Sequence, residues 1–188
     1  MSKIRFPAAI GLQVAAEICR ILKPACTRLI VAGSLRRRKP EIGDVEILYI
    51  PRIDVVPDPA DLFASIQQDL AEAAIAGMEG QGILARRKNV NGQETYGSQN
   101  KLMLHVATGL PVDLFAATEK NWYNYLVCRT GSAENNLRIA SQAQRLGYKW
   151  NPYRAGYTEL SSGRTIPMES EEQVFTFIKL PYLPPEHR

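Results

Sequence analysis

Apolar side chains recur at helical spacing near the start of the chain. Residues 8–23 place them three or four positions apart, as in Val14, Ile18 and Leu22, so that they share one face of a helix. Pro24 lacks the amide hydrogen that a continuing helix needs. We therefore predict a first helix over residues 8–23.

Short apolar runs follow that helix and indicate buried strands. The runs at residues 28–33 and 45–50 are mostly apolar, bounded by turn residues and too short for helices. Residues 83–116 contain the turn pairs Asn-Gly and Thr-Gly between alternating segments, which predicts a meander of strands ending in a hairpin.

A second helix is predicted over residues 58–78. Asp58 suits the N-cap, Pro59 suits the first helical position, and Gly77 lies near the exit. After Thr118 the pattern changes to short helices and one hairpin, and Ser132 and Ser170 are the predicted caps of two of these helices. We place a domain boundary near residue 118, which divides the chain into residues 1–118 and 119–188.

Composition narrows the class of protein. The chain has 188 residues, is 45% hydrophobic and carries a formal net charge of +4, which suits a folded protein with an anionic partner. Its three cysteines form no CxxC pair, which argues against a disulfide framework or a zinc site. Neither a membrane-spanning run nor a secretory signal is found in the sequence, so we expect a cytoplasmic location. We also expect a monomer.

Three carboxylates interrupt apolar strands. Asp44 and Glu46 lie two positions apart and therefore project from the same face of a strand, and Asp113 lies in a later strand. A solvent-facing sheet edge would explain an isolated pair of acids. Three converging carboxylates would instead repel one another unless cations neutralise them, and Mg²⁺ prefers such oxygen ligands.

A phosphate-binding turn is the second candidate feature. Gly33 and Ser34 end the first predicted strand, where backbone amides and a hydroxyl can receive phosphate oxygens. The basic run LRRRKP follows directly and contains Arg37, whose fork can grip a phosphate. Taken alone, this run is better explained as a solvated basic loop.

The order of these motifs resembles the nucleotidyltransferase superfamily and, more narrowly, the polymerase core of the DNA polymerase X family, which contains DNA polymerase beta. The resemblance rests on GSLRR, GDVEIL, PVDLF, RTGSAENN and GYKWNPY, in this order, and runs from about residue 8 to the C-terminus. It implies an α+β fold, with a nucleotidyltransferase palm of mixed sheet and two helices over residues 1–118. A small thumb-like subdomain of helices and a hairpin, which binds the nascent base pair, would occupy residues 119–188.

The resemblance also implies roles for individual residues. Asp44, Glu46 and Asp113 would hold two Mg²⁺ ions, with Mn²⁺ as the alternative, and these acids would be the catalytic residues. The residues that would bind the incoming nucleoside triphosphate are Gly33, Ser34, Arg37, Gly43, Thr130, Gly131, Ser132 and Asn136. Cys128 and Arg129 would stand at the sugar gate.

Several positions depart from the usual pattern of the family. Glu46 replaces an aspartate, Cys128 and Arg129 replace two aromatic residues, and Pro111 stands where a basic residue often supports the last acid. We expect that the altered gate lets ribonucleotides be incorporated. We also expect the chain to lack the amino-terminal lyase domain of many relatives, so that its grip on DNA is weak and salt-sensitive.

The sequence thus predicts a DNA polymerase that adds nucleotides to a primer 3′ end by a two-metal mechanism, in gap filling or repair. Its partners would be gapped or primed DNA and nucleoside triphosphates, with no membrane. Two alternatives stay open. One is a nucleotidyltransferase that needs no template or acts on another acceptor, and the other is a catalytically silent nucleic-acid-binding module.

Overall fold

A five-stranded mixed sheet forms the centre of the N-terminal part. The computed structural model describes residues 4–58 and 60–188. The sheet runs in the order β2 (Cys26–Val31), β4 (Val45–Pro51), β9 (Leu110–Ala116), β8 (Asn100–His105) and β7 (Leu84–Arg86). The β4 and β9 strands are parallel and the other neighbours are antiparallel. The predicted mixed α+β architecture is confirmed.

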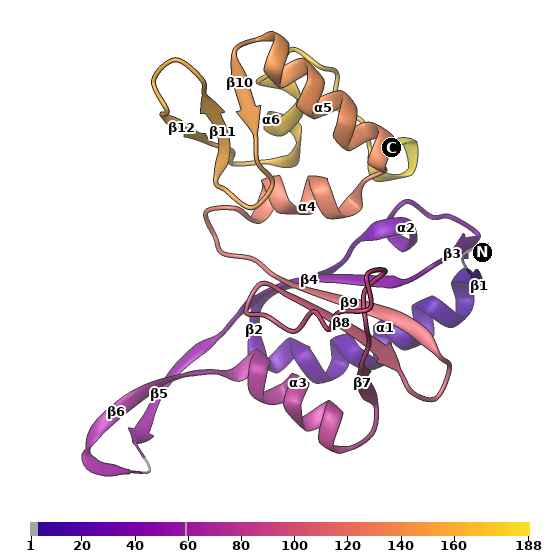
Figure 1. Ribbon diagram of the computed structural model, residues 1–188, viewed down its shortest axis with the longest axis vertical. Coiled ribbons are helices and arrows are strands. Elements are labelled where there is room, and N and C mark those ends of the chain that lie inside the picture. Colours follow the sequence, from indigo (N-terminus) through magenta and orange to yellow (C-terminus); the bar gives the residue numbers. More distant parts are fainter. Residues whose placement is uncertain (1–3, 59) are drawn as a thin grey trace.

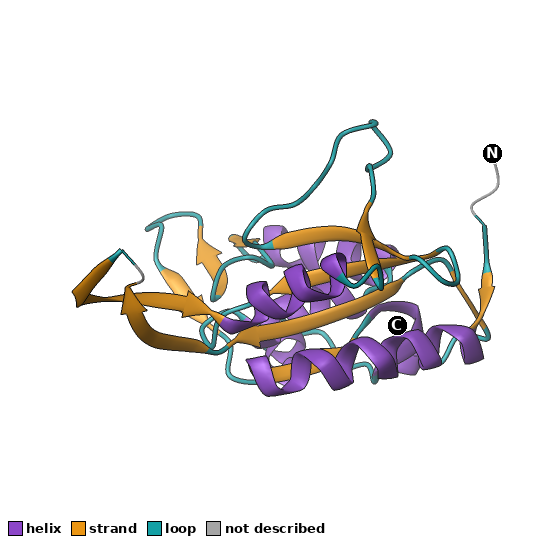
Figure 2. Ribbon diagram, turned by 90° about the horizontal axis from the view of Figure 1, so that it is seen from below, coloured by secondary structure: helices purple, strands orange, loops and turns teal. Residues whose placement is uncertain are grey.

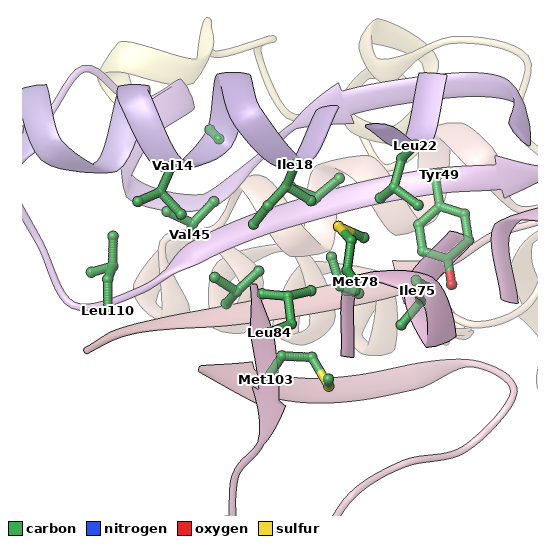
Figure 3. Close-up of a cluster of buried hydrophobic side chains, with 14 of the residues drawn as sticks. Val14, Ile18, Leu22, Val45, Tyr49, Ile75, Met78, Leu84, Met103 and Leu110 are labelled. Atoms are coloured by element: carbon green, nitrogen blue, oxygen red, sulfur yellow. The ribbon is translucent and has the colours of Figure 1, made fainter. Parts of the chain in front are cut away.

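Two helices cover one face of this sheet. They are α1 (Ala8–Leu22), followed by the short 3₁₀ turn η1 (Lys23–Ala25), and α3 (Leu70–Gly80). The helical stripe predicted for α1 is buried, and Figure 3 shows Ile18 of α1 in the same cluster as Val45 and Tyr49 of β4 and Met78 of α3. The first helix is therefore confirmed within one residue of its predicted end.

The opposite face of the sheet carries α4 (Trp122–Thr130). Leu48 and Ile50 of β4 form a second buried cluster with Trp122 and Leu126 of α4. Because side chains alternate along a strand, Glu46 projects from the same face as Leu48. The apolar end of that face is covered by α4, and the acidic end is left at the junction with the C-terminal part.

The C-terminal part has its own core. It contains α5 (Ala133–Arg145), the antiparallel sheet of β10 (Tyr148–Trp150), β11 (Gly156–Glu159) and β12 (Thr165–Pro167), then α6 (Glu171–Thr176) and the turn η2 (Pro185–His187). Val127 of α4, Ile139 of α5, Tyr157 of β11 and Phe175 of α6 are buried together. Figure 1 shows this part stacked over the sheet with α4 between them.

The predicted caps of the C-terminal helices are confirmed. Ser132 accepts a hydrogen bond from the amide of Asn135 at 3.3 Å, and Ser170 accepts one from the amide of Gln173 at 3.0 Å. The predicted hairpin over residues 157–168 is present as β11 and β12. The boundary near residue 118 stays a prediction, since α4 contributes side chains to the clusters on both sides of it.

The helix predicted over residues 58–78 is wrong in its first half. A hairpin of β5 (Ile53–Asp58) and β6 (Asp61–Asp69) precedes α3, and the predicted N1 residue Pro59 lies outside the described residues. Asp69 is the actual N-cap and accepts a hydrogen bond from the amide of Glu72 at 2.9 Å. The hairpin projects from the body of the protein (Figure 2).

Two short elements frame the first basic turn. The strand β1 (Phe6–Pro7) pairs with β3 (Glu41–Ile42), and α2 (Gly33–Arg36) begins where β2 ends. These elements bring the Gly33-Ser34 turn to the end of β4 at which the acids lie. Within the described residues, no helix combines the length and the apolar character needed to cross a bilayer.

Candidate active site

The acids lie on two neighbouring central strands. Glu46 of β4 is the direct partner of Asp113 in the parallel pairing with β9, where strands are about 4.8 Å apart. Asp44 immediately precedes β4, two positions before Glu46, and therefore shares its face. The β4 strand is flanked by β2 and β9, so a solvent-facing sheet edge does not explain these residues.

Glu46 has a strongly shifted pKa. Burial raises its pKa to about 8, and the charges of Asp44 and Asp113 add to this effect, while Arg129 and Arg37 oppose it. The carboxylates of Asp44 and Asp113 therefore repel that of Glu46 on this face of the sheet. A cation placed among them would relieve this repulsion.

Gly33 makes room for the Glu46 carboxylate. A Cβ atom at position 33 would lie 2.1 Å from Glu46 Oε2, and the backbone φ of Gly33 is +61°. Both the close approach and the left-handed conformation require glycine. The turn after β2 and the second acid of β4 therefore fit together as one unit.

Arg87 supports Asp113, and the sequence did not reveal it. The Nη2 atom of Arg87 donates to Asp113 Oδ1, and its Nε atom donates to the carbonyl of Met103 at 3.1 Å. The expected basic neighbour is absent at Pro111, yet a guanidinium reaches the acid from the segment after β7. Asp44, Asp113 and Arg87 line one cavity of about 290 Å³.

The donor set suits a hard cation, although the side chains do not converge on one point. As the described side chains stand, no group of three or more histidine, cysteine, aspartate or glutamate residues is arranged to hold a metal ion. Glu46 packs against Gly33, and Asp113 is bound to Arg87. Three carboxylates on one face still provide the oxygen ligands that Mg²⁺ prefers, so the residues fit in kind and would need side-chain rotation.

Ser34 and Arg37 face a basic cavity next to the acids. Both line a space of about 400 Å³ together with Arg5 and Lys39. The hydroxyl of Ser34 is buried and has no hydrogen-bond partner among residues 4–58 and 60–188. Gly43 is buried in the bend that leads into β4. These positions fit the predicted phosphate-binding turn.

The turn from Thr130 to Ser132 meets the same basic run. Arg37 donates through Nη1 to the carbonyl of Thr130, and a Cβ at Gly131 would lie 3.0 Å from that nitrogen. Arg36 donates to the Thr130 hydroxyl at 2.6 Å. Two motifs about ninety residues apart are therefore in direct contact.

Asn136 and the two gate residues have partners within the protein. Asn136 Nδ2 donates to the carbonyl of Cys128 at 2.9 Å. The guanidinium of Arg129 lies 3.8 Å from the centroid of the Phe115 ring and donates to the hydroxyl of Tyr153 at 2.8 Å. Arg129 is thus anchored on aromatic side chains beside Glu46, whose pKa it lowers.

Comparison with known proteins identifies the C-terminal part. Residues 125–188 match the family model of the DNA polymerase beta thumb. No curated protein matches the chain. The match supports the resemblance to the DNA polymerase X family over this segment, and a thumb domain of this kind implies an interaction with DNA.

Proposed function

We propose that this DNA polymerase beta-like chain adds nucleotides to a DNA primer 3′ end under the direction of a template, in gap filling or repair. The observation that carries the proposal is the position of Glu46 and Asp113. They are direct partners on β4 and β9, on the sheet face that meets a thumb domain. We call the sheet part the palm.

The acids are the proposed metal ligands. Asp44, Glu46 and Asp113 would hold two Mg²⁺ ions, or Mn²⁺, and such ions activate an attacking hydroxyl and neutralise charge on phosphate. Burial and like charges disfavour the ionised form of Glu46 in the protein alone. A divalent cation reverses that preference. The same repulsion that destabilises the bare site therefore makes it selective for cations.

The basic cavity is the proposed triphosphate site. The Ser34 hydroxyl there has no hydrogen-bond partner in the described part of the chain. Burial lowers the pKa of the Arg37 guanidinium, and the charges of Glu46 and Asp44 oppose that effect. Arg37 can thus stay charged while it contacts phosphate. Gly33 and Gly43 allow the backbone to approach closely.

The thumb supplies the remaining nucleotide contacts. Thr130, Gly131 and Ser132 would line the sugar and base, and Asn136 would reach the minor groove of the new base pair once it leaves the Cys128 carbonyl. Arg129 fills the place of an aromatic gate residue and is held on Phe115. We infer that it excludes ribonucleotides poorly.

Primer extension on a gapped duplex tests the proposal. With Mg²⁺ or Mn²⁺ and all four deoxynucleotides, we expect products whose sequence follows the template, and we expect Asp113→Ala to abolish them. Untemplated tails would favour a template-independent nucleotidyltransferase. Absence of any product with intact DNA binding would leave a silent DNA-binding module.

A further inference from the structure

A groove runs along the β2 edge of the palm sheet. It has a volume of about 500 Å³, and every residue of β2 lines it, together with Cys19 of α1 and Lys23 of η1. Among the described strands, β2 pairs with β4 alone. The opposite edge strand, β7, has only three residues, and a short edge offers little to a further strand. The long apolar edge of the sheet is therefore β2.

The backbone of β2 offers hydrogen bonds at this edge. The amide of Ala32, directly after β2, donates to the carbonyl of Glu46 at 2.8 Å. Because alternate residues of an antiparallel strand bond the same neighbour, the amides and carbonyls of Leu29 and Val31 point away from β4. Both side chains are half-buried against the core under α1. An added strand would therefore meet backbone donors and acceptors as well as apolar side chains.

The β5–β6 hairpin exposes apolar side chains that belong to no core. Among the described residues, none of the three buried clusters includes a side chain from residues 53–69. Phe63, Val55 and Ile66 are 100%, 71% and 42% exposed. A two-stranded hairpin is marginally stable in water by itself. Its exposed apolar surface therefore indicates a site of protein contact.

The hairpin and the β2 groove carry opposite charges. Residues 53–69 contain four aspartates and no lysine or arginine, although the whole chain has a formal net charge of +4. DNA would repel such a hairpin. Among the described residues, the groove is lined by two basic side chains, Lys23 and Arg28, and by no acidic one. Arg28 is paired with Glu119 at 3.4 Å, so exposed Lys23 is the cation that a partner would meet.

We propose that the chain forms a two-fold symmetric dimer in which the β5–β6 hairpin of each copy adds to the β2 edge of the other. The strand that pairs with β2 is β6, because its nine residues contain no proline, whereas Pro57 removes a backbone donor from β5. An acidic hairpin meets a basic groove at both junctions. This interface does not depend on the proposed function, and it replaces the monomer expected from the sequence.

The position of the hairpin fits a reciprocal exchange. Cys26 at the start of β2 pairs with Pro51 at the end of β4, and β5 begins two residues later at Ile53. The hairpin therefore leaves the sheet at the end where the groove begins (Figure 1). The six residues of β2 span about 20 Å, and β6 is long enough to cover them. Asp44 and Glu46 lie at the other end of β4, so the dimer leaves the candidate active site open.

Sedimentation analysis over a range of protein concentrations tests the inference without DNA. We expect the mass to rise from that of one chain to twice that value and to stop there, because a two-fold exchange closes on itself. The mass of a single chain at every concentration up to about 1 mM would overturn the inference. A mass that keeps growing with concentration would overturn the two-fold arrangement.

Matched variants assign the interface to the two surfaces. Phe63→Asp on the hairpin and Lys23→Glu at the groove should each raise the dimer dissociation constant at least about tenfold. Val90→Asp and Arg145→Glu change an exposed apolar residue and an exposed cation elsewhere, and should leave the constant unchanged. An effect of Phe63→Asp alone would mean that hairpins pair with each other, and an effect of Lys23→Glu alone would mean that β2 edges do. Either result overturns the exchange.

Hydrogen exchange distinguishes strand addition from a looser contact. The amides of Leu29 and Val31 should exchange at least about tenfold more slowly in the dimer than in the dilute single chain, whereas the amide of Ile30, which faces β4, should not change. If the dimer forms and the amides of Leu29 and Val31 exchange as fast as in the single chain, β6 does not pair with β2 and the inference is overturned.

Discussion

The guanidinium of Arg36 in the palm forms a bidentate ion pair with the carboxylate of Glu171 in the thumb, although 135 residues separate them in sequence. Arg36 donates through Nη1 to Glu171 Oε2 at 3.0 Å and through Nη2 to Oε1. Arg188 donates to the same carboxylate at 2.8 Å. One acid thus joins the palm, the first helix after the thumb hairpin and the end of the chain.

Loss of this acid should destabilise the protein. In Glu171→Ala the guanidinium groups of Arg36 and Arg188 are left largely buried without a counter-ion, which we expect to cost about 3 kcal/mol in the free energy of unfolding. Urea denaturation measures it. Glu172→Ala, at the exposed neighbouring position, should change stability by less than about 0.5 kcal/mol. Equal effects of the two changes would refute the bridge.

The same carboxylate predicts how stability depends on pH. Burial alone would raise the pKa of Glu171, but the hydrogen bonds and charges of Arg36 and Arg188 outweigh it and hold the pKa below its ordinary value of 4.5. The stabilisation is therefore complete above that ordinary value and is lost as the pH falls through the lower folded-state value.

Unfolding experiments at a series of pH values check this sign. The difference in stability between the wild-type chain and Glu171→Gln should be largest near neutral pH and should shrink below about pH 4.5. A difference that stays constant down to about pH 3 would show that Glu171 is not held in its charged form by the two arginines.

Gly33→Ala should displace Glu46 and remove activity. The new Cβ would lie 2.1 Å from Glu46 Oε2, and a shift of about 1 Å in a reacting group can cost a hundredfold in rate. Gly109→Ala is the matched control, because Gly109 has a φ of +68° but nothing within 4 Å of an added Cβ. An alanine at a positive φ should lower the free energy of unfolding by about 1 kcal/mol in both variants. Only Gly33→Ala should lose nucleotide addition.

Arg87→Ala should weaken the site through Asp113. The arginine orients this acid by a direct ion pair, and loss of a residue that orients a metal ligand typically costs about tenfold to a hundredfold in activity. Single-turnover rates on a gapped duplex measure the loss. Lys88→Ala removes the adjacent exposed cation. If Lys88→Ala lowers the single-turnover rate as much as Arg87→Ala does, the loss of a positive charge that attracts DNA explains both results, and the contact with Asp113 does not.

Local patterns were sufficient to predict the elements that position the acids. The stripe of α1, the apolar runs of β2 and β4 and the caps at Ser132 and Ser170 each depend on neighbouring residues. The helix predicted from Asp58 begins at Leu70 instead, with Asp69 as its N-cap. The residues before it pair as a hairpin from Ile53 to Asp69, and a helical pattern does not reveal strand pairing.

The contacts that complete the site are long-range. Arg87 and Asp113 are 26 residues apart, and Arg36 and Thr130 are 94 apart. The sequence does not distinguish neighbouring arginines in a basic run. Only the folded structure shows which arginine contacts an acid and which contacts a turn. The types of the site residues could therefore be predicted, whereas the residues that support them could not.

The rate of filling a one-nucleotide gap, measured opposite each of the four template bases, tests the central claim most directly. We predict that the wild-type chain inserts the complementary nucleotide fastest in all four cases when Mg²⁺ or Mn²⁺ is present, and that Asp44→Asn and Asp113→Asn do not. Insertion that ignores the template base, or that persists in both variants, would contradict the account.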